Sequence, residues 1–119
     1  MEANKEKELA MVMSAVTILG YCVSALILVL GVPLVLGMVE PNSAYGFRTA
    51  QTLADESVWY QLNTIAGWGM IAAGACSGLF IRVCSQYKNL NKVQSITAIG
   101  LAPGLFPAVI IGLLYLFLM

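Results

Sequence analysis

Three long runs without a charged residue constrain this chain more than any other feature. They cover residues 10–39, 57–81 and 93–119, which are 30, 25 and 27 residues long. Each exceeds the ~20 residues that an α-helix needs to cross a hydrocarbon core of ~30 Å. A water-soluble domain of 119 residues could not bury a chain that is 60% hydrophobic. The sequence therefore predicts an all-α membrane protein with three transmembrane helices, packed as a compact bundle in a single domain (1–119).

Turn-forming and capping residues set the expected boundaries. Gly46 permits a tight turn after the first run, and Thr52 fits a helix N-cap with Asp55 at the capping-box position. Pro103 and Pro107 should kink the third helix. We expect helix 1 over about 9–39, an ordered outer loop over 40–52, helix 2 over about 53–82, a cytoplasmic loop over 83–92 and helix 3 over about 93–119.

The basic residues are distributed unevenly between the two sides of the membrane. Arg48 alone lies between the first two runs, on one side. The other side carries the remaining five, which are Lys5, Lys7, Arg82, Lys88 and Lys92. Under the positive-inside rule, this bias predicts a multi-pass membrane protein with a cytoplasmic N-terminus. Residues 40–56 and the C-terminus are then expected outside.

Composition argues against several classes of function. The net charge of zero predicts no nucleic-acid partner, and the absence of histidine removes the commonest metal ligand, so we expect no metal and no cofactor. Of the three cysteines, Cys22 and Cys76 are expected as buried small residues within spans. A transporter or channel is disfavoured because no ionisable residue lies within a run. No nucleophile–base pair is visible, so we expect no enzymatic activity.

Small residues recur at helical spacing on the second and third helices. Close approach of helix backbones in lipid depends on such residues, because no hydrophobic force drives helices together there. We therefore expect helices 2 and 3 in close contact through these positions. They are Gly74, Gly78, Gly100, Gly104, Ala108 and Gly112.

The polar stretch between the first two runs, residues 41–67, holds the candidate site. In one interpretation, Arg48 pairs with Glu56 or Asp55 and fixes the loop to the bundle. We prefer this interpretation, since structural ion pairs are common where charges are scarce. In the other, Tyr45, Arg48, Trp59 and Asn63 line a pocket at the outer leaflet for an anionic headgroup or a peptide carboxylate. Trp59 and Tyr60 are also expected in an interfacial aromatic belt.

The same stretch carries a long, spaced motif, N-x-x-x-G-x-R-T-x-x-T-L, followed by an acidic pair, a tryptophan and N-x-x-x-G. This motif resembles the signature of the SdpI family, which takes its name from a bacterial immunity protein against a secreted antimicrobial peptide. The matching positions are Asn42, Gly46, Arg48, Thr49, Thr52, Glu56, Trp59, Asn63 and Gly67.

The resemblance implies a small, non-enzymatic polytopic protein of a bacterial inner membrane. Its role would be immunity to, or protection from, a membrane-active peptide, with the peptide or a lipid bound at the outer leaflet by the outer loop. The alternative is an accessory subunit that docks onto a larger membrane complex. Self-association into a homo-oligomer through the glycine faces is a further open alternative.

Overall fold

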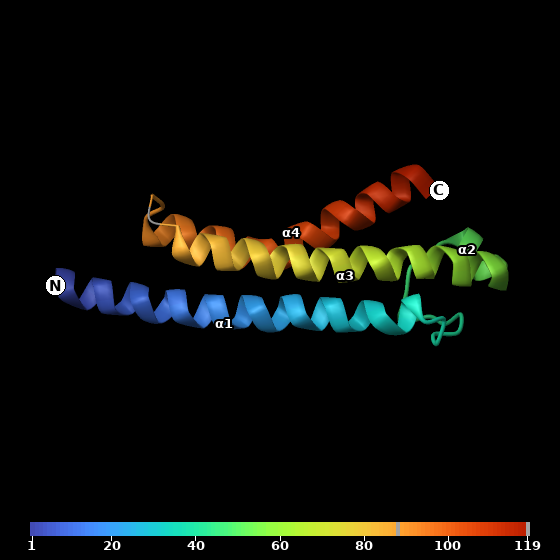
Figure 1. The fold of residues 1–119 in the computed structure, drawn as a ribbon, viewed down its shortest axis with the longest axis horizontal. Coiled ribbons are helices and arrows are strands. Elements are labelled where there is room, and N and C mark those ends of the chain that lie inside the picture. Colours follow the sequence, from blue (N-terminus) through green and yellow to red (C-terminus); the bar gives the residue numbers. More distant parts are fainter. Residues whose placement is uncertain (88, 119) are drawn as a thin grey trace.

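The computed structural model describes residues 1–87 and 89–118 and contains four helices in that part of the chain (Figure 1). They are α1 (Glu2–Val35), α2 (Ala50–Ala54), α3 (Glu56–Gln86) and α4 (Lys92–Leu118). Three of them, α1, α3 and α4, are long and apolar enough to cross a membrane. The prediction of an all-α protein with three candidate transmembrane helices is therefore confirmed.

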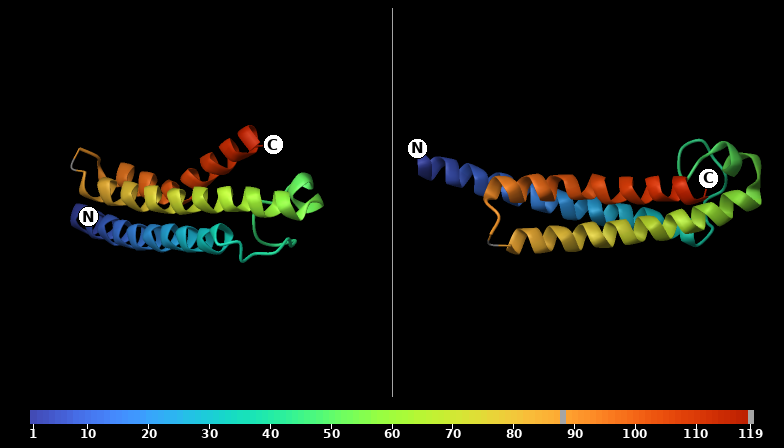
Figure 2. Two further views of the ribbon diagram at one scale, coloured as in Figure 1. Left: turned by 45° about the vertical axis from the view of Figure 1, so that its right-hand side comes forward. Right: turned by 90° about the horizontal axis from the view of Figure 1, so that it is seen from above.

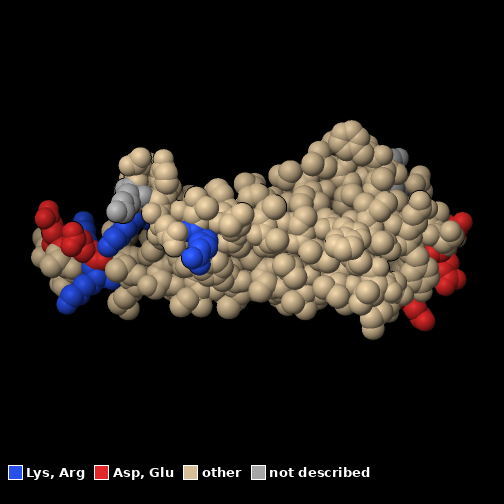
Figure 3. Space-filling view, in the orientation of Figure 1, with Lys and Arg blue, Asp and Glu red and all other residues tan. Residues whose placement is uncertain are grey.

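The three long helices lie side by side along one axis, and each contacts the other two. All views place the N-terminus and the α3–α4 turn at one end of the molecule, which we call the N-terminal end (Figures 1 and 2). The α1–α2 loop (residues 36–49), α2 and the end of α4 lie at the other, the loop end. The molecule is 61 Å long. A hydrocarbon core is ~30 Å thick, so the molecule is longer than the core it would cross. In the view of Figure 3, acidic side chains lie at both ends and basic ones in the half toward the N-terminal end, and the surface between the innermost basic group and the loop end is uncharged.

Helix α1 begins and ends earlier than the predicted 9–39. It begins at Glu2 because the charged N-terminal residues are good helix formers and need no lipid to form hydrogen bonds within the helix. Its end is a Schellman motif around Gly37, which has φ +68°. There, Gly37 N–H donates to Leu34 O at 3.3 Å and Met38 N–H donates to Pro33 O at 3.0 Å.

The start of the second long helix also differs from the prediction, in which Thr52 was the N-cap. Thr49 caps the short α2 instead, and Thr52 completes the capping box: each threonine Oγ1 accepts from the backbone N–H of the other. Asp55 then caps α3 by accepting from Ser57 N–H at 2.8 Å. The capping-box rule holds, but the box lies three residues earlier than predicted and starts the short α2. Because Asp55 caps the next helix separately, α3 covers Glu56–Gln86 rather than 53–82.

The closest backbone approach is between α1 and α3. A Cβ on Gly31 would lie 2.5 Å from Gly67 O, and one on Gly67 would lie 2.7 Å from Gly31 O. Further along, a Cβ on Gly74 would lie 2.5 Å from Ser24 O. Ser24 and Ser77 are both buried and share a hydrogen bond between their hydroxyl groups at 2.8 Å. We call this set of contacts the α1–α3 seam. Side chains larger than hydrogen cannot fit at its glycines without moving backbone.

Helices α3 and α4 are in contact as predicted, but the glycines named for this contact do not make it. Gly74 packs on α1, and a Cβ on Gly78, Gly104 or Gly112 would meet nothing within 4 Å. Gly100 approaches Val16 of α1 rather than α3, and Ala108 is exposed. The α3–α4 contact includes the rings of Phe80 and Phe106, which meet edge to face, and Gly69, where an added Cβ would lie 2.7 Å from the Ile110 side chain. A buried cluster of Ile81, Cys84, Ile99 and Ala102 lies toward the N-terminal end.

Burial of the cysteines also differs from expectation. Cys22 and Cys76 lie on exposed helix surfaces, and Cys84 is the buried one. An uncharged surface accepts a cysteine as well as a core does, so hydrophobicity alone does not separate the two environments. Two expectations, the position of Lys88 and the end of the third helix at Met119, lie outside the described residues.

Candidate functional site

Asn42 organises the turn at the centre of the α1–α2 loop. Its side-chain Oδ1 accepts from the backbone N–H groups of Ala44 (2.8 Å) and Tyr45 (2.6 Å). Its Nδ2 donates to the carbonyls of Glu40 (2.7 Å) and Tyr45 (3.0 Å). One asparagine amide thus satisfies four backbone groups that no helix could satisfy, and it fixes the course of the loop.

Asn63 holds this loop on α3. Its Oδ1 accepts from Phe47 N–H at 2.5 Å, and its Nδ2 donates to Phe47 O at 3.2 Å and to Trp59 O at 2.9 Å. Asn63 is 2% exposed, so these bonds form away from water. Buried polar groups are costly to leave unpaired, and the pairing of both polar backbone groups of Phe47 therefore specifies the position of the loop.

Trp59 lies under the loop and not in an interfacial belt, contrary to the prediction. Its side chain is 0% exposed, and its Nε1 donates to Val39 O at 2.9 Å. Gly46 passes directly over it with φ +117°. A Cβ on Gly46 would lie 2.7 Å from Asn63 Oδ1 and 3.1 Å from the Trp59 ring. Both the backbone angle and the close approach require glycine at this position.

Tyr45 links the loop to α1, since its hydroxyl donates to the carbonyl of Leu30. Burial raises the pKa of the Tyr45 phenol above its ordinary value of 10.0. The folded state therefore holds this proton more tightly than the unfolded state does. The stability gained from the raised pKa is present below pH 10.0 and is lost as the pH rises through the higher folded-state value.

Arg48 does not form the predicted ion pair. Its Nη1 donates to the carbonyl of Ser43, and within the described residues it bonds to neither Asp55 nor Glu56. The Asp55 carboxylate is used as the cap of α3, and Glu56 is exposed on the first turn of that helix. The Arg48 side chain is exposed at the surface of the loop.

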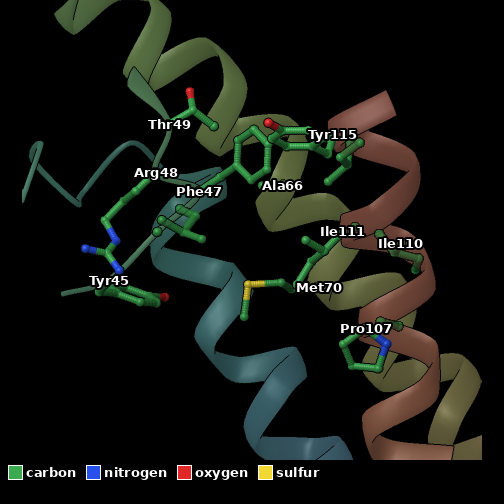
Figure 4. Close-up of a pocket in the computed structure, with 15 residues that line it drawn as sticks. Tyr45, Phe47, Arg48, Thr49, Ala66, Met70, Pro107, Ile110, Ile111 and Tyr115 are labelled. Carbon is green, nitrogen blue, oxygen red and sulfur yellow. The ribbon is translucent and has the colours of Figure 1, made fainter. Parts of the chain in front are cut away.

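An apolar cavity of about 440 Å³ lies beside this loop, between α1, α3 and α4 (Figure 4). The loop supplies one wall through Tyr45, Phe47 and Arg48, and the second half of α4 supplies the opposite wall. Of the described residues that line the cavity, Arg48 alone is charged. Its exposed lining residues mark the opening, and they are Arg48, Ile111 and Tyr115. The cavity therefore combines an apolar interior with one cation at its edge.

The α4 wall is the part of this site that the sequence did not predict. It consists of Pro107, Ile110, Ile111, Leu114 and Tyr115. Apolar residues cover all sides of a transmembrane helix, so no periodicity distinguishes the residues that face a cavity from those that face lipid. Pro103 and Pro107 are the sequence signals, because a proline in the helix interior releases carbonyls and lets the helix turn away from its neighbour. In Figure 1 the second half of α4 does diverge from α3.

Most of the motif positions have a definite structural part. Asn42 and Gly46 shape the loop, Thr49 and Thr52 cap α2, Trp59 and Asn63 hold the loop, and Gly67 forms the seam. Arg48 and Glu56 differ, since both are exposed. The structure therefore brings Tyr45, Gly46, Arg48 and Thr49 together at the cavity, while Trp59 and Asn63 lie behind the loop as its support.

The sequence was compared with curated proteins, solved structures and protein-family models. No curated protein and no solved structure matches the sequence. A model of the SdpI/YfhL protein family matches residues 38–118, which include most of the α1–α2 loop and all of α2, α3 and α4. The match covers all the motif positions, from Asn42 to Gly67, and both the α3 and α4 walls of the cavity. The chain belongs to the SdpI/YfhL protein family.

Proposed function

We propose that this multi-pass membrane protein is non-enzymatic and protects a bacterial cell by binding a membrane-active peptide at the cavity beside the α1–α2 loop. The cavity is the observation that carries the proposal. Its apolar walls suit the apolar face of an amphipathic segment, and Arg48 at the edge suits a carboxylate of that segment.

The surroundings of Arg48 favour a recruiting role over a structural one. Its side chain is exposed, and the one hydrogen bond that fixes it goes to the Ser43 carbonyl of the same loop. A guanidinium has five N–H donors, so others remain to bind a ligand. The loop behind it is held by Asn63 and Trp59, so the ligand would meet a pre-formed surface.

The proposed orientation follows the positive-inside rule, with the N-terminus in the cytoplasm and the loop outside the inner membrane. The cavity then lies at the outer leaflet, where a secreted peptide arrives. Protection would consist of sequestering the peptide before it assembles in the bilayer.

A growth assay tests this function. Cells that produce the protein are challenged with a panel of purified membrane-active peptides, and the peptide concentration that halves growth is measured. We expect protection against at least one peptide, and we expect Arg48→Ala and Ile111→Trp, which respectively remove the cation and obstruct the opening of the cavity, to abolish it. The matched controls are Lys5→Ala and Leu113→Trp, which lie outside the cavity.

Equal protection by Arg48→Ala and Ile111→Trp, at production levels equal to the parent, would exclude the cavity as the binding site. A lack of protection by the parent protein against the whole panel would overturn the immunity function.

One observation favours a second candidate function, an accessory subunit of a larger membrane complex. Gly100, Gly104, Ala108 and Gly112 form an exposed face of α4, and Gly104 and Gly112 have no atoms within 4 Å of an added Cβ. Such a face lets another transmembrane helix approach closely. Purification in mild detergent tests it: a stoichiometric partner lost in Gly104→Leu supports this candidate, and a chain that purifies alone opposes it.

A further inference from the structure

A second groove lies between α1 and α3, and it is separate from the cavity beside the loop. Its volume is about 450 Å³, and α4 contributes nothing to its lining. Along α3 it extends from Gly74 to Arg82, which is ~12 Å at 1.5 Å per residue. The residues that line it are Tyr21, Ser24, Ala25, Leu28, Gly74, Ala75, Gly78, Leu79 and Arg82.

Small residues keep this groove open. At its deep end, Gly74 is closed off by Ser24 and Leu28 of α1. Near its mouth the helices are less tightly apposed, because a Cβ on Gly78 would meet nothing within 4 Å. The space beside Gly78 is thus available to an occupant and is not needed for helix packing.

Arg82 supplies the charge at the mouth of the groove. It is the one charged residue among those described in the lining, and its side chain is exposed. Within the described residues its guanidinium has no hydrogen bond or ion pair, although its backbone carbonyl accepts from Ser85 Oγ. An arginine with five donors and no partner among the described residues is available for an anion from outside the protein.

The depth of Arg82 fits the headgroup level of one leaflet. A hydrocarbon core needs ~20 helical residues, and twenty residues from Arg82 along α3 lead to Leu62. Leu62 lies next to Asn63, at the start of the polar loop end. Arg82 therefore lies at the opposite boundary of the apolar region, on the side of the N-terminal end.

We propose that this groove binds one anionic phospholipid from the leaflet at the N-terminal end. Arg82 binds the phosphate, with the Tyr21 hydroxyl as a second polar group, and the first part of an acyl chain lies along Ala25, Gly78 and Leu79. The acyl chain is in an apolar environment whether bound or free, so it adds little selectivity. The charge of Arg82 decides the preference for an anionic headgroup.

Lipid retention in nanodiscs tests the proposal independently of the peptide-binding function. The purified protein is placed in phosphatidylcholine discs that contain a minority of spin-labelled phosphatidylglycerol, and the immobilised fraction is compared with that of spin-labelled phosphatidylcholine. We expect a preference of about fivefold for phosphatidylglycerol, the equivalent of ~1 kcal/mol for one basic residue at a membrane surface. Arg82→Gln should reduce the preference to about one, and Arg82→Lys should retain most of it.

A pair of variants on α3 tests the groove itself. Gly78→Leu fills the space beside Gly78 and should reduce the preference as Arg82→Gln does, whereas Ala72→Leu adds bulk to an exposed position outside the groove and should not. Equal retention of the two lipids by the parent protein, or an unchanged preference in Arg82→Gln, would overturn the proposal. The proposal would also be overturned if Gly78→Leu converted a dimer into a monomer and left the lipid preference intact. That result would mean that a second copy of the chain, and not a lipid, occupies the groove. If Gly78→Leu does not fold, the Arg82 variants decide.

Discussion

The loop end and the α1–α3 seam hold the same two helices together by opposite means. At the loop end, side-chain amides and an indole bind backbone groups of a loop, as in Asn63 with Phe47 and Trp59 with Val39. In the seam, Gly31 and Gly67 bring two backbones into contact with no side chain between them. The loop end depends on directional hydrogen bonds, and the seam depends on glycines, whose lack of a side chain lets the two backbones meet.

This difference follows from the surroundings of each region. A loop has backbone N–H and C=O groups outside regular structure, and at the edge of a membrane they need protein partners. In the helix interior the backbone groups are paired within each helix, so close packing and a few buried hydroxyl bonds such as Ser24–Ser77 are sufficient. The two regions should therefore respond differently to substitution.

The largest expected effect is in the seam. Gly31→Ala places a methyl group 2.5 Å from Gly67 O, a backbone atom that no rotamer change can move. We expect a loss of ~2–3 kcal/mol in the free energy of unfolding in detergent, at the upper end of overpacking costs. Gly104→Ala is the control, because its Cβ meets nothing and alanine favours helix by up to ~1 kcal/mol. Equal stability of the two variants would mean that the seam is not tightly packed.

Next in size is the loop support. Asn63→Leu leaves Phe47 N–H and C=O unpaired above Trp59, at a cost of about 2 kcal/mol for buried polar groups. The loop should also be released, which trypsin cleavage after Arg48 can report. The control is Gln61→Leu, an exposed position on the same helix. If cleavage is equally slow in both variants, Asn63 does not hold the loop.

A smaller effect is expected from the cap of α3. Asp55→Ala removes the acceptor for Ser57 N–H and should cost ~1 kcal/mol of unfolding free energy. Asp55→Asn keeps a side-chain oxygen at this position and should recover most of that loss. The same loss in both variants would indicate that charge, and not the cap, is what matters at Asp55.

The smallest effect concerns Arg48. Since its side chain is exposed and not paired with Glu56, Arg48→Ala should change unfolding free energy by less than ~0.5 kcal/mol. A double-mutant cycle with Glu56→Gln should give a coupling energy near zero. A coupling of 1 kcal/mol or more, on the order expected of a partly buried pair, would restore the ion pair that the sequence suggested.

The sequence predicts the three membrane helices well, because length and lack of charge are sufficient to identify them. The sequence also indicates that a capping box is present, but it does not decide which residues form it. Thr49 with Thr52 and Thr52 with Asp55 both have capping-box spacing. Contacts between distant positions are not encoded in any local pattern. Gly31 and Gly67 meet across 36 positions, and the bond from Trp59 reaches back 20 residues to Val39. The same tryptophan near a helix start would suit an interfacial belt equally well.

The support of the loop by α3 has a consequence for the opposite side of the cavity. Asn63 and Trp59 fix Phe47 and Val39 in position, so the loop wall of the cavity is held on α3. Across the cavity stands the second half of α4, where Pro107 and three aliphatic side chains provide contacts without preferred direction. A wider or narrower occupant would be accommodated by tilting the second half of α4 about the turn that contains Pro107, while the hydrogen bonds of the loop stay unchanged. Selection of the occupant by its shape would then be weak, while Arg48 on the loop wall would keep its position.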